Sequence, residues 1–118
     1  EVGFLELSEK ATGEPSNVIR ARVEAARERQ RKRFADDGIL LNAQMNAKLI
    51  KRYCAPDEAS ERLLARAYAE LKLSARAYQR ILKVARTIAD VEGSDQITLA
   101  HYAEAIQYRS LDQSGREA

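Results

Sequence analysis

The sequence predicts a single all-α domain of about five helices in a bundle-like arrangement. Its 118 residues suffice for one hydrophobic core and are fewer than the length at which chains usually divide into domains. Hydrophobic residues make up 45% and charged residues 32% of the chain, with only 5 glycines and 2 prolines, a composition typical of helical proteins. Apolar residues also recur at helical spacing in several segments that are bounded by capping residues and turn formers.

The first predicted helix spans residues 18–34 and follows a loop over residues 8–16. The loop sequence, SEKATGEPS, is rich in small polar residues, and either Ser16 or Asn17 suits a helix start. At 100° per residue, five side chains fall within an arc of about 80° and form a thin core stripe. They are Ile19, Val23, Ala26, Gln30 and Phe34.

Two further helices are expected in the middle of the chain. Residues 36–38 (Asp-Asp-Gly) break the first helix, so a short second helix is expected over residues 43–53. Its inward-facing side chains are Met45, Leu49 and Ile50. Pro56 suits the first position of a third helix that extends to about residue 71. The apolar residues at helical spacing in this third helix are Leu63, Leu64, Ala67, Tyr68 and Leu71.

The fourth and fifth predicted helices have the clearest boundaries. Ser74 is a favoured N-cap residue, so the fourth helix should begin at Ala75. Gly93 suits the left-handed position that follows a helix end. Thr98 then caps the fifth helix, whose apolar residues are Leu99, Tyr102, Ala103 and Ile106. The polar tail over residues 113–118 is expected to be disordered.

Positive charge is concentrated in the first predicted helix. The formal net charge of the chain is only +2, but residues 20–33 hold seven basic residues against two acidic ones. The basic residues are Arg20, Arg22, Arg27, Arg29, Arg31, Lys32 and Arg33. This helix is either a solvated amphipathic helix or a surface that contacts nucleic acid or a neighbouring subunit. Sequence-specific recognition of single strands is not expected, because the one aromatic residue, Phe34, lies on the core stripe.

The composition excludes several kinds of site. Cys54 is the only cysteine, so it cannot form an internal disulfide, and it has no second cysteine or nearby histidine with which to bind zinc. We expect it to be a small buried side chain and expect no metal site. The longest apolar run is about four residues, and no signal peptide precedes it, so we expect a cytoplasmic protein without membrane contact.

The beginning of the chain suggests a longer protein. The sequence starts at Glu1 without methionine, and EVGFLEL forms an apolar, β-prone stub with no partner strand elsewhere in the chain. We therefore expect an extended N-terminal stub and a segment that belongs to a larger protein.

Arg76 raises a question about the fourth predicted helix. It falls in the first turn, where exposed N–H groups make a helix electropositive and disfavour a cation by ~0.3–1 kcal/mol. The face opposite the apolar residues carries Arg76, Arg80, Lys83 and Thr87. A basic stripe alone is usually a solvated surface. A cation in the first turn becomes favourable when an anion lies there too, so Arg76 and Arg80 are candidate contacts for a phosphate.

No catalytic constellation is recognisable in the sequence. His101 falls in the first turn of the fifth helix without a serine or cysteine nucleophile at a suitable spacing, so we expect a surface or boundary histidine. The chain also has no G-x-x-x-x-G-K-[ST] loop, so it is not expected to bind a triphosphate in the P-loop manner by itself.

Four blocks of sequence resemble a known family when they are taken together and in order. They are GEPSNVIRARVEAARERQRKRF, LNAQMNA, LSARAYQRILKVARTIAD and HYAEAIQYRSLD. They resemble the C-terminal region of the magnesium-chelatase-like AAA+ ATPases, the family of the ComM-like and YifB-like competence proteins. The similarity extends from Glu1 to about Asp112.

The resemblance implies an organisation for the chain. Residues 1–15 would be the end of an upstream AAA+ core segment and a linker, and residues 16–112 would form the helical lid domain. In this family the lid follows a core that carries the P-loop and the arginine finger. The implied partners are that core, neighbouring subunits of a ring homo-oligomer, and DNA.

The resemblance also gives Arg76 a role. It implies that Arg76 is the sensor-2 arginine, directed at the γ-phosphate of ATP bound with Mg²⁺ in the longer protein, while the fragment alone binds no nucleotide. The implied function is ATP-driven remodelling of DNA, such as helicase activity or branch migration in DNA uptake and recombination. Two alternatives remain open: metal insertion into a porphyrin by a magnesium chelatase, and a free-standing basic module that binds nucleic acid or protein.

Overall fold

The structure is a computed structural model that describes residues 13–117, with side chains described up to residue 109. This part of the chain contains five α-helices, one 3₁₀ turn and no strand, which confirms the all-α prediction. The elements are α2 (Ser16–Arg33), η1 (Asn42–Gln44), α3 (Ala47–Tyr53), α4 (Glu58–Glu70), α5 (Ala75–Glu92) and α6 (Leu99–Glu117). The predicted extended stub over residues 1–7 lies outside the described residues.

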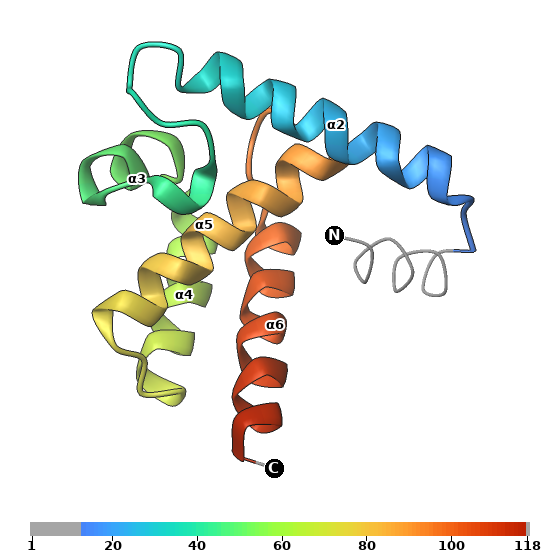
Figure 1. The fold of residues 1–118 in the computed structure, drawn as a ribbon. Coiled ribbons are helices and arrows are strands. Elements are labelled where there is room, and N and C mark those ends of the chain that lie inside the picture. The colour runs from blue at the N-terminus through green and yellow to red at the C-terminus, as the bar shows by residue number, and fades with distance from the viewer. Residues whose placement is uncertain (1–12, 118) are drawn as a thin grey trace.

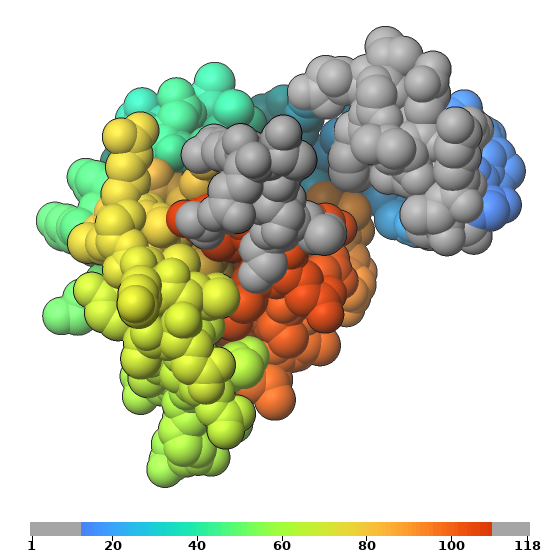
Figure 2. Space-filling view, turned by 90° about the horizontal axis from the view of Figure 1, so that it is seen from below, coloured from blue at the N-terminus to red at the C-terminus, as the bar shows by residue number. Residues whose placement is uncertain are grey.

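Helix α5 is the centre of the arrangement. It contacts α2, η1, α3 and α6, and α2 lies across its C-terminal end (Figure 1). Helices α4 and α6 lie side by side on the face seen in Figure 2. The two ends of α5 are therefore in different surroundings, one beside α2 and the other at the opposite side of the domain.

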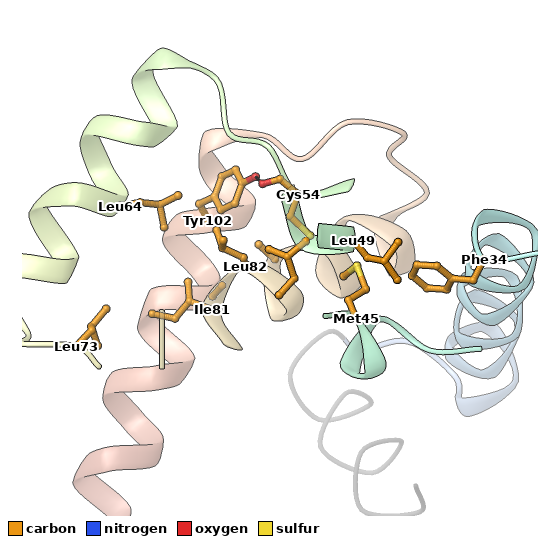
Figure 3. Close-up of a cluster of buried hydrophobic side chains, with 12 residues drawn as sticks. Phe34, Met45, Leu49, Cys54, Leu64, Leu73, Ile81, Leu82 and Tyr102 are labelled. Carbon is orange, nitrogen blue, oxygen red and sulfur yellow. Dashed lines mark hydrogen bonds between the residues drawn. The ribbon is translucent and has the colours of Figure 1, made fainter. Parts of the chain in front are cut away.

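The buried core is one cluster that extends from Phe34, directly after α2, to Tyr102 and Ala105 of α6. Phe34, Met45 and Leu49 pack together at one end of it, whereas Leu64 and Ile81 fill the other (Figure 3). In the middle, the Tyr102 hydroxyl donates a hydrogen bond to the Cys54 carbonyl oxygen at 2.8 Å. Both residues are fully buried, which confirms the prediction of a buried Cys54.

Several predicted boundaries need correction. The Asn46 side chain accepts a hydrogen bond from the Leu49 N–H, so α3 begins at Ala47 and not at residue 43. Asp57 caps α4 in the same way through the Ser60 N–H, and Pro56 therefore lies outside the helix. In both cases a side-chain acceptor determines the helix start.

Both ends of α5 and the start of α6 agree more closely with the prediction. Helix α5 begins at Ala75 and is followed by Gly93 at φ 81°, as the sequence indicates. Helix α6 begins at Leu99, directly after Thr98. It continues to Glu117, so residues 113–117 are helical where the sequence suggests a disordered tail.

Candidate functional site

The start of α5 carries two exposed arginines. The Ser74 hydroxyl accepts a hydrogen bond from the Ala77 N–H at 3.1 Å and fixes the first turn of the helix. Arg76 and Arg80 are both exposed, and neither forms a hydrogen bond or ion pair with another described residue. The first turn contains no acidic residue. The positive end of the helix dipole therefore coincides with cations that no described residue compensates, an arrangement that favours an external anion.

The other two residues of the predicted basic face, Lys83 and Thr87, form hydrogen bonds within the domain. The Lys83 ammonium donates a hydrogen bond to the Ala43 carbonyl oxygen at 3.0 Å. The Thr87 hydroxyl accepts one from the Asn42 amide at 3.1 Å and donates one to the Lys83 carbonyl oxygen. Lys83 and Thr87 thus contact the segment at η1, whereas Arg76 and Arg80 have no partner among the described residues.

The seven basic residues of α2 separate into rows. Three of them form what we call the inner row, at spacings of seven and four residues: Arg22, Arg29 and Arg33. Three others form the outer row at the same spacings: Arg20, Arg27 and Arg31. Lys32 lies apart from both rows and is exposed. At 100° per residue, each row stays within an arc of about 40°.

The inner row faces other parts of the domain. Arg22 pairs with Glu14, and Arg29 pairs with Asp95 at 2.8 Å and donates to the Gly93 carbonyl oxygen at 3.0 Å. The exposed fraction of the side chain falls along the row, from 44% to 35% and then to 12% at the last arginine. The inner row therefore lies partly in contacts that hold the domain together.

A buried ion-pair network joins α2 to α5. Arg33 donates two hydrogen bonds to the Asp90 carboxylate, at 2.6 and 2.8 Å, and one to the Asn42 side chain at 3.0 Å. Arg86 lies 3.2 Å from the same carboxylate and donates to the carbonyl oxygens of Ser94 and Asp95. Asp90 is fully buried, so these partners supply the polar contacts that water would otherwise make.

The network changes the interpretation of Arg33. The sequence predicts it as a contact for nucleic acid or a neighbouring subunit, but the structure places it between α2, η1 and α5. Its release would leave the buried Asp90 carboxylate without its bidentate partner, which is unfavourable. We therefore remove Arg33 from the candidate surface. Burial also lowers the pKa of Arg86, although the neighbouring Asp90 carboxylate acts in the opposite direction.

Sequence analysis misses Asp90 and Asn42 because they pair with residues that are distant in the chain, and it misses Arg86 although its partners lie only four to nine residues away. Arg33 and Asp90 are 57 residues apart, and Asn42 and Asp90 are 48 apart. One local signal is available: Asp90 lies in the last turn of α5, where the helix dipole disfavours an anion. Like Arg76, Asp90 carries a charge that the helix dipole disfavours, but at the opposite end of the helix. The positive charges that compensate it, Arg33 and Arg86, lie within the domain.

His101 is buried, with 3% of its surface exposed, and is not the surface or boundary residue that the sequence predicts. Its Nδ1 accepts a hydrogen bond from the Thr98 N–H at 2.8 Å, and its Nε2 lies 3.1 Å from a Glu92 carboxylate oxygen. A side chain at the third helical position that accepts from the backbone of the N-cap residue stabilises a helix start. His101 therefore helps to fix the beginning of α6.

A groove of about 560 Å³ lies between α4 and α6. Its lining residues are Ala59, Arg62, Leu63, Arg66, Leu99 and Ala103. None of the predicted site residues lies in it. Over the described part of the chain, we find no group of three or more side chains that could hold a metal ion. Among residues 13–117, no helix is long and apolar enough to cross a membrane.

The fold and the exposed arginines define the class of the chain: an all-α helical domain with a basic helix start that faces outward. Residues 13–109 match the family described as magnesium chelatase, subunit ChlI C-terminal. The chain therefore belongs to this family, and it is a helical lid domain of a magnesium-chelatase-like protein.

Individual relatives support the same assignment. The chain is 45% identical over 107 residues to the uncharacterized protein YifB of Salmonella typhimurium, covering 90% of this chain and 20% of that protein. It is 43% identical over 99 residues to the competence protein ComM of Haemophilus influenzae, covering 84% of this chain and 19% of that protein. The chain thus spans about a fifth of the length of the curated relatives that it matches.

Proposed function

We propose that this domain is the sensor-2 lid of an AAA+ ATPase and that Arg76 contacts the γ-phosphate of ATP. The observation that carries the proposal is the exposed Arg76 in the first turn of α5, with no anion of the described chain to compensate it. Membership of the magnesium chelatase family supports it, because the resemblance to AAA+ lids implies a phosphate-sensing arginine at this position.

The arginine would act by electrostatics. A guanidinium fixed on a rigid helix can stabilise the negative charge that spreads over the phosphoryl oxygens during transfer. ATP with Mg²⁺ would be bound by an upstream core, since this chain has no P-loop motif. When the γ-phosphate leaves, Arg76 loses its partner, and the lid can then move relative to that core.

The work coupled to hydrolysis is proposed to be DNA remodelling, such as branch migration during DNA uptake. Two observations favour this substrate: the basic surface of α2 and the relative that is named a competence protein. Magnesium insertion into a porphyrin is a second candidate function, because the family is described as a magnesium chelatase subunit. The two are separated by supplying the whole protein with branched DNA or with a porphyrin and Mg²⁺ and measuring which one stimulates ATP hydrolysis.

A series of alanine variants in the longer protein tests the role of Arg76. Arg76→Ala should lower the ATPase rate by about 10- to 1,000-fold, and Arg80→Ala, one turn further from the helix start, should lower it less. Lys83→Ala should have the smallest effect on the rate, because its ammonium is bound to the Ala43 carbonyl oxygen. Arg66→Ala is the matched control, since Arg66 is also exposed but lies on α4. Equal rates for the Arg76 and Arg66 variants would refute the proposal.

A further inference from the structure

The outer row of α2 is a second basic surface, remote from Arg76. Arg20, Arg27 and Arg31 are all exposed, whereas the inner row, at identical spacing on the same helix, becomes progressively buried towards α5. The row lies on α2, across the C-terminal end of α5, whereas Arg76 lies at the other end of that helix (Figure 1). A helix of 18 residues is about 27 Å long, so the two surfaces can be altered independently.

The ion pair of Arg31 leaves that side chain open to a phosphate. Arg31 pairs with Glu28 at 2.5 Å, but the two side chains are 66% and 47% exposed. Exposed pairs of this kind contribute little and are screened by salt, so a phosphate can replace the carboxylate. Arg20 has no hydrogen bond or ion pair with another described residue.

The spacing of the outer row suits a nucleic-acid strand. At 1.5 Å per residue, the three arginines are separated along the axis by about 10 and 6 Å. These separations correspond to about three and two nucleotides at the rise of one strand in duplex DNA, 3.4 Å per nucleotide. Guanidinium groups pair readily with phosphate oxygens, often by two hydrogen bonds.

We propose that the outer row, Arg20, Arg27 and Arg31, binds the phosphate backbone of duplex DNA. The inference rests on the proposed role in DNA remodelling and specifies which surface touches the DNA. No aromatic side chain lies on this row, so the contact positions the duplex without selecting a sequence. Glu24 is exposed and lies beside the row, where it opposes the approach of phosphates.

The test is the affinity of the 118-residue chain for a labelled DNA duplex, measured by fluorescence anisotropy at several salt concentrations. Replacement of all three outer-row arginines by glutamine should weaken binding at least tenfold at low salt. It should also reduce the slope of log K against log salt by about 0.9 for each phosphate that the variant no longer neutralises. Glu24→Gln should strengthen binding two- to fivefold.

The control variant removes the same charge elsewhere. Lys48→Gln, Arg62→Gln and Arg66→Gln together lower the net charge equally at exposed positions of α3 and α4 and should change the affinity less than threefold. Thermal melting verifies that each variant is folded, and the double variant Arg20→Gln, Arg31→Gln replaces the triple one if that fails to fold.

The inference would be overturned by no binding by the unaltered chain at low salt, by equal weakening by both triple variants, or by no response to Glu24→Gln. An acidic protein partner for the row would be indicated if the outer-row variant assembled poorly with other subunits but bound DNA normally, and this too would refute it. Because these titrations need no ATP, their failure leaves the role of Arg76 to be judged separately by the ATPase rates.

Discussion

At the scale of single residues, the backbone of Lys72 has an unfavourable conformation. Lys72 has φ 52°, in the left-handed region that normally favours glycine. It follows the end of α4, where the Leu73 N–H donates to the Tyr68 carbonyl oxygen. The same backbone motif follows α5, but there Gly93 occupies the left-handed position at φ 81°. Lys72 therefore bears a strain that Gly93 avoids.

Lys72→Gly should stabilise the domain by about 0.5–1 kcal/mol, because glycine adopts the left-handed conformation without the steric cost of a Cβ atom. The melting temperature of the chain should rise by a few degrees. Lys51→Gly is the matched control: Lys51 is also exposed but helical, so glycine there should destabilise by about 1 kcal/mol. If both substitutions lower the melting temperature, backbone strain at Lys72 is not a significant cost.

At the scale of elements, α5 carries at each end a residue whose charge the helix dipole disfavours. Arg76 in the first turn has no partner among the described residues, whereas Asp90 in the last turn is surrounded by Arg33, Arg86 and Asn42. The network holds α2 and η1 against α5 and reaches the turn before α6 through Arg86. The C-terminal end of α5 is therefore held by this polar network, in addition to the core packing of Ile81, Leu82 and Ala85.

Asp90→Asn should destabilise the chain by about 3–5 kcal/mol, because it leaves two largely buried guanidinium groups without their carboxylate. Urea denaturation measures the change. Asp95→Asn provides the comparison, since the Asp95 side chain pairs with Arg29 but is 92% exposed, and its loss should cost less than about 1 kcal/mol. A similar small effect for both variants would show that the buried network is not important for stability.

The elements that can be predicted from the sequence are those determined by local chemistry. Ser74 and Gly93 bound α5 correctly because a hydroxyl cap and a left-handed glycine act within a few residues. Pro56 is misleading because Asp57, one residue later, supplies the side-chain acceptor that actually starts α4.

The separation of the α2 arginines into two rows can be predicted from their spacing in the sequence. Which row faces α5 and the turn that follows it depends on residues more than 50 positions away, such as Asp90 and Asp95, and cannot be predicted locally.

At the scale of the whole molecule, the core surrounds Cys54 and Tyr102. Burial raises the pKa of the Cys54 thiol to about 11 and also raises the pKa of the Tyr102 hydroxyl. The folded state therefore favours the neutral thiol. Its contribution to the free energy of unfolding is complete below pH 9, the unfolded value, and is lost as the pH rises from 9 towards 11.

The Cys54 thiol should consequently react slowly with a thiol reagent at pH 8 while the chain is folded. At a pKa of about 11, roughly 0.1% of the thiol is ionised at that pH, and the side chain is also inaccessible. Addition of urea should increase the reaction rate in parallel with loss of helical circular dichroism. Rapid reaction in native conditions would show that the core opens locally around Cys54.

The described part of the domain presents two separate basic surfaces: the start of α5, for which we propose a nucleotide phosphate, and the outer row of α2, for which we propose DNA. The central claim is that Arg76 acts on the phosphate and not on the fold. The most direct measurement is single-turnover ATP hydrolysis by the Arg76→Ala variant of the longer protein, with thermal melting of the same sample. We predict a rate reduced by about 10- to 1,000-fold and a stability unchanged or raised by at most ~1 kcal/mol. An unchanged rate, or a markedly lower melting temperature, would contradict the claim.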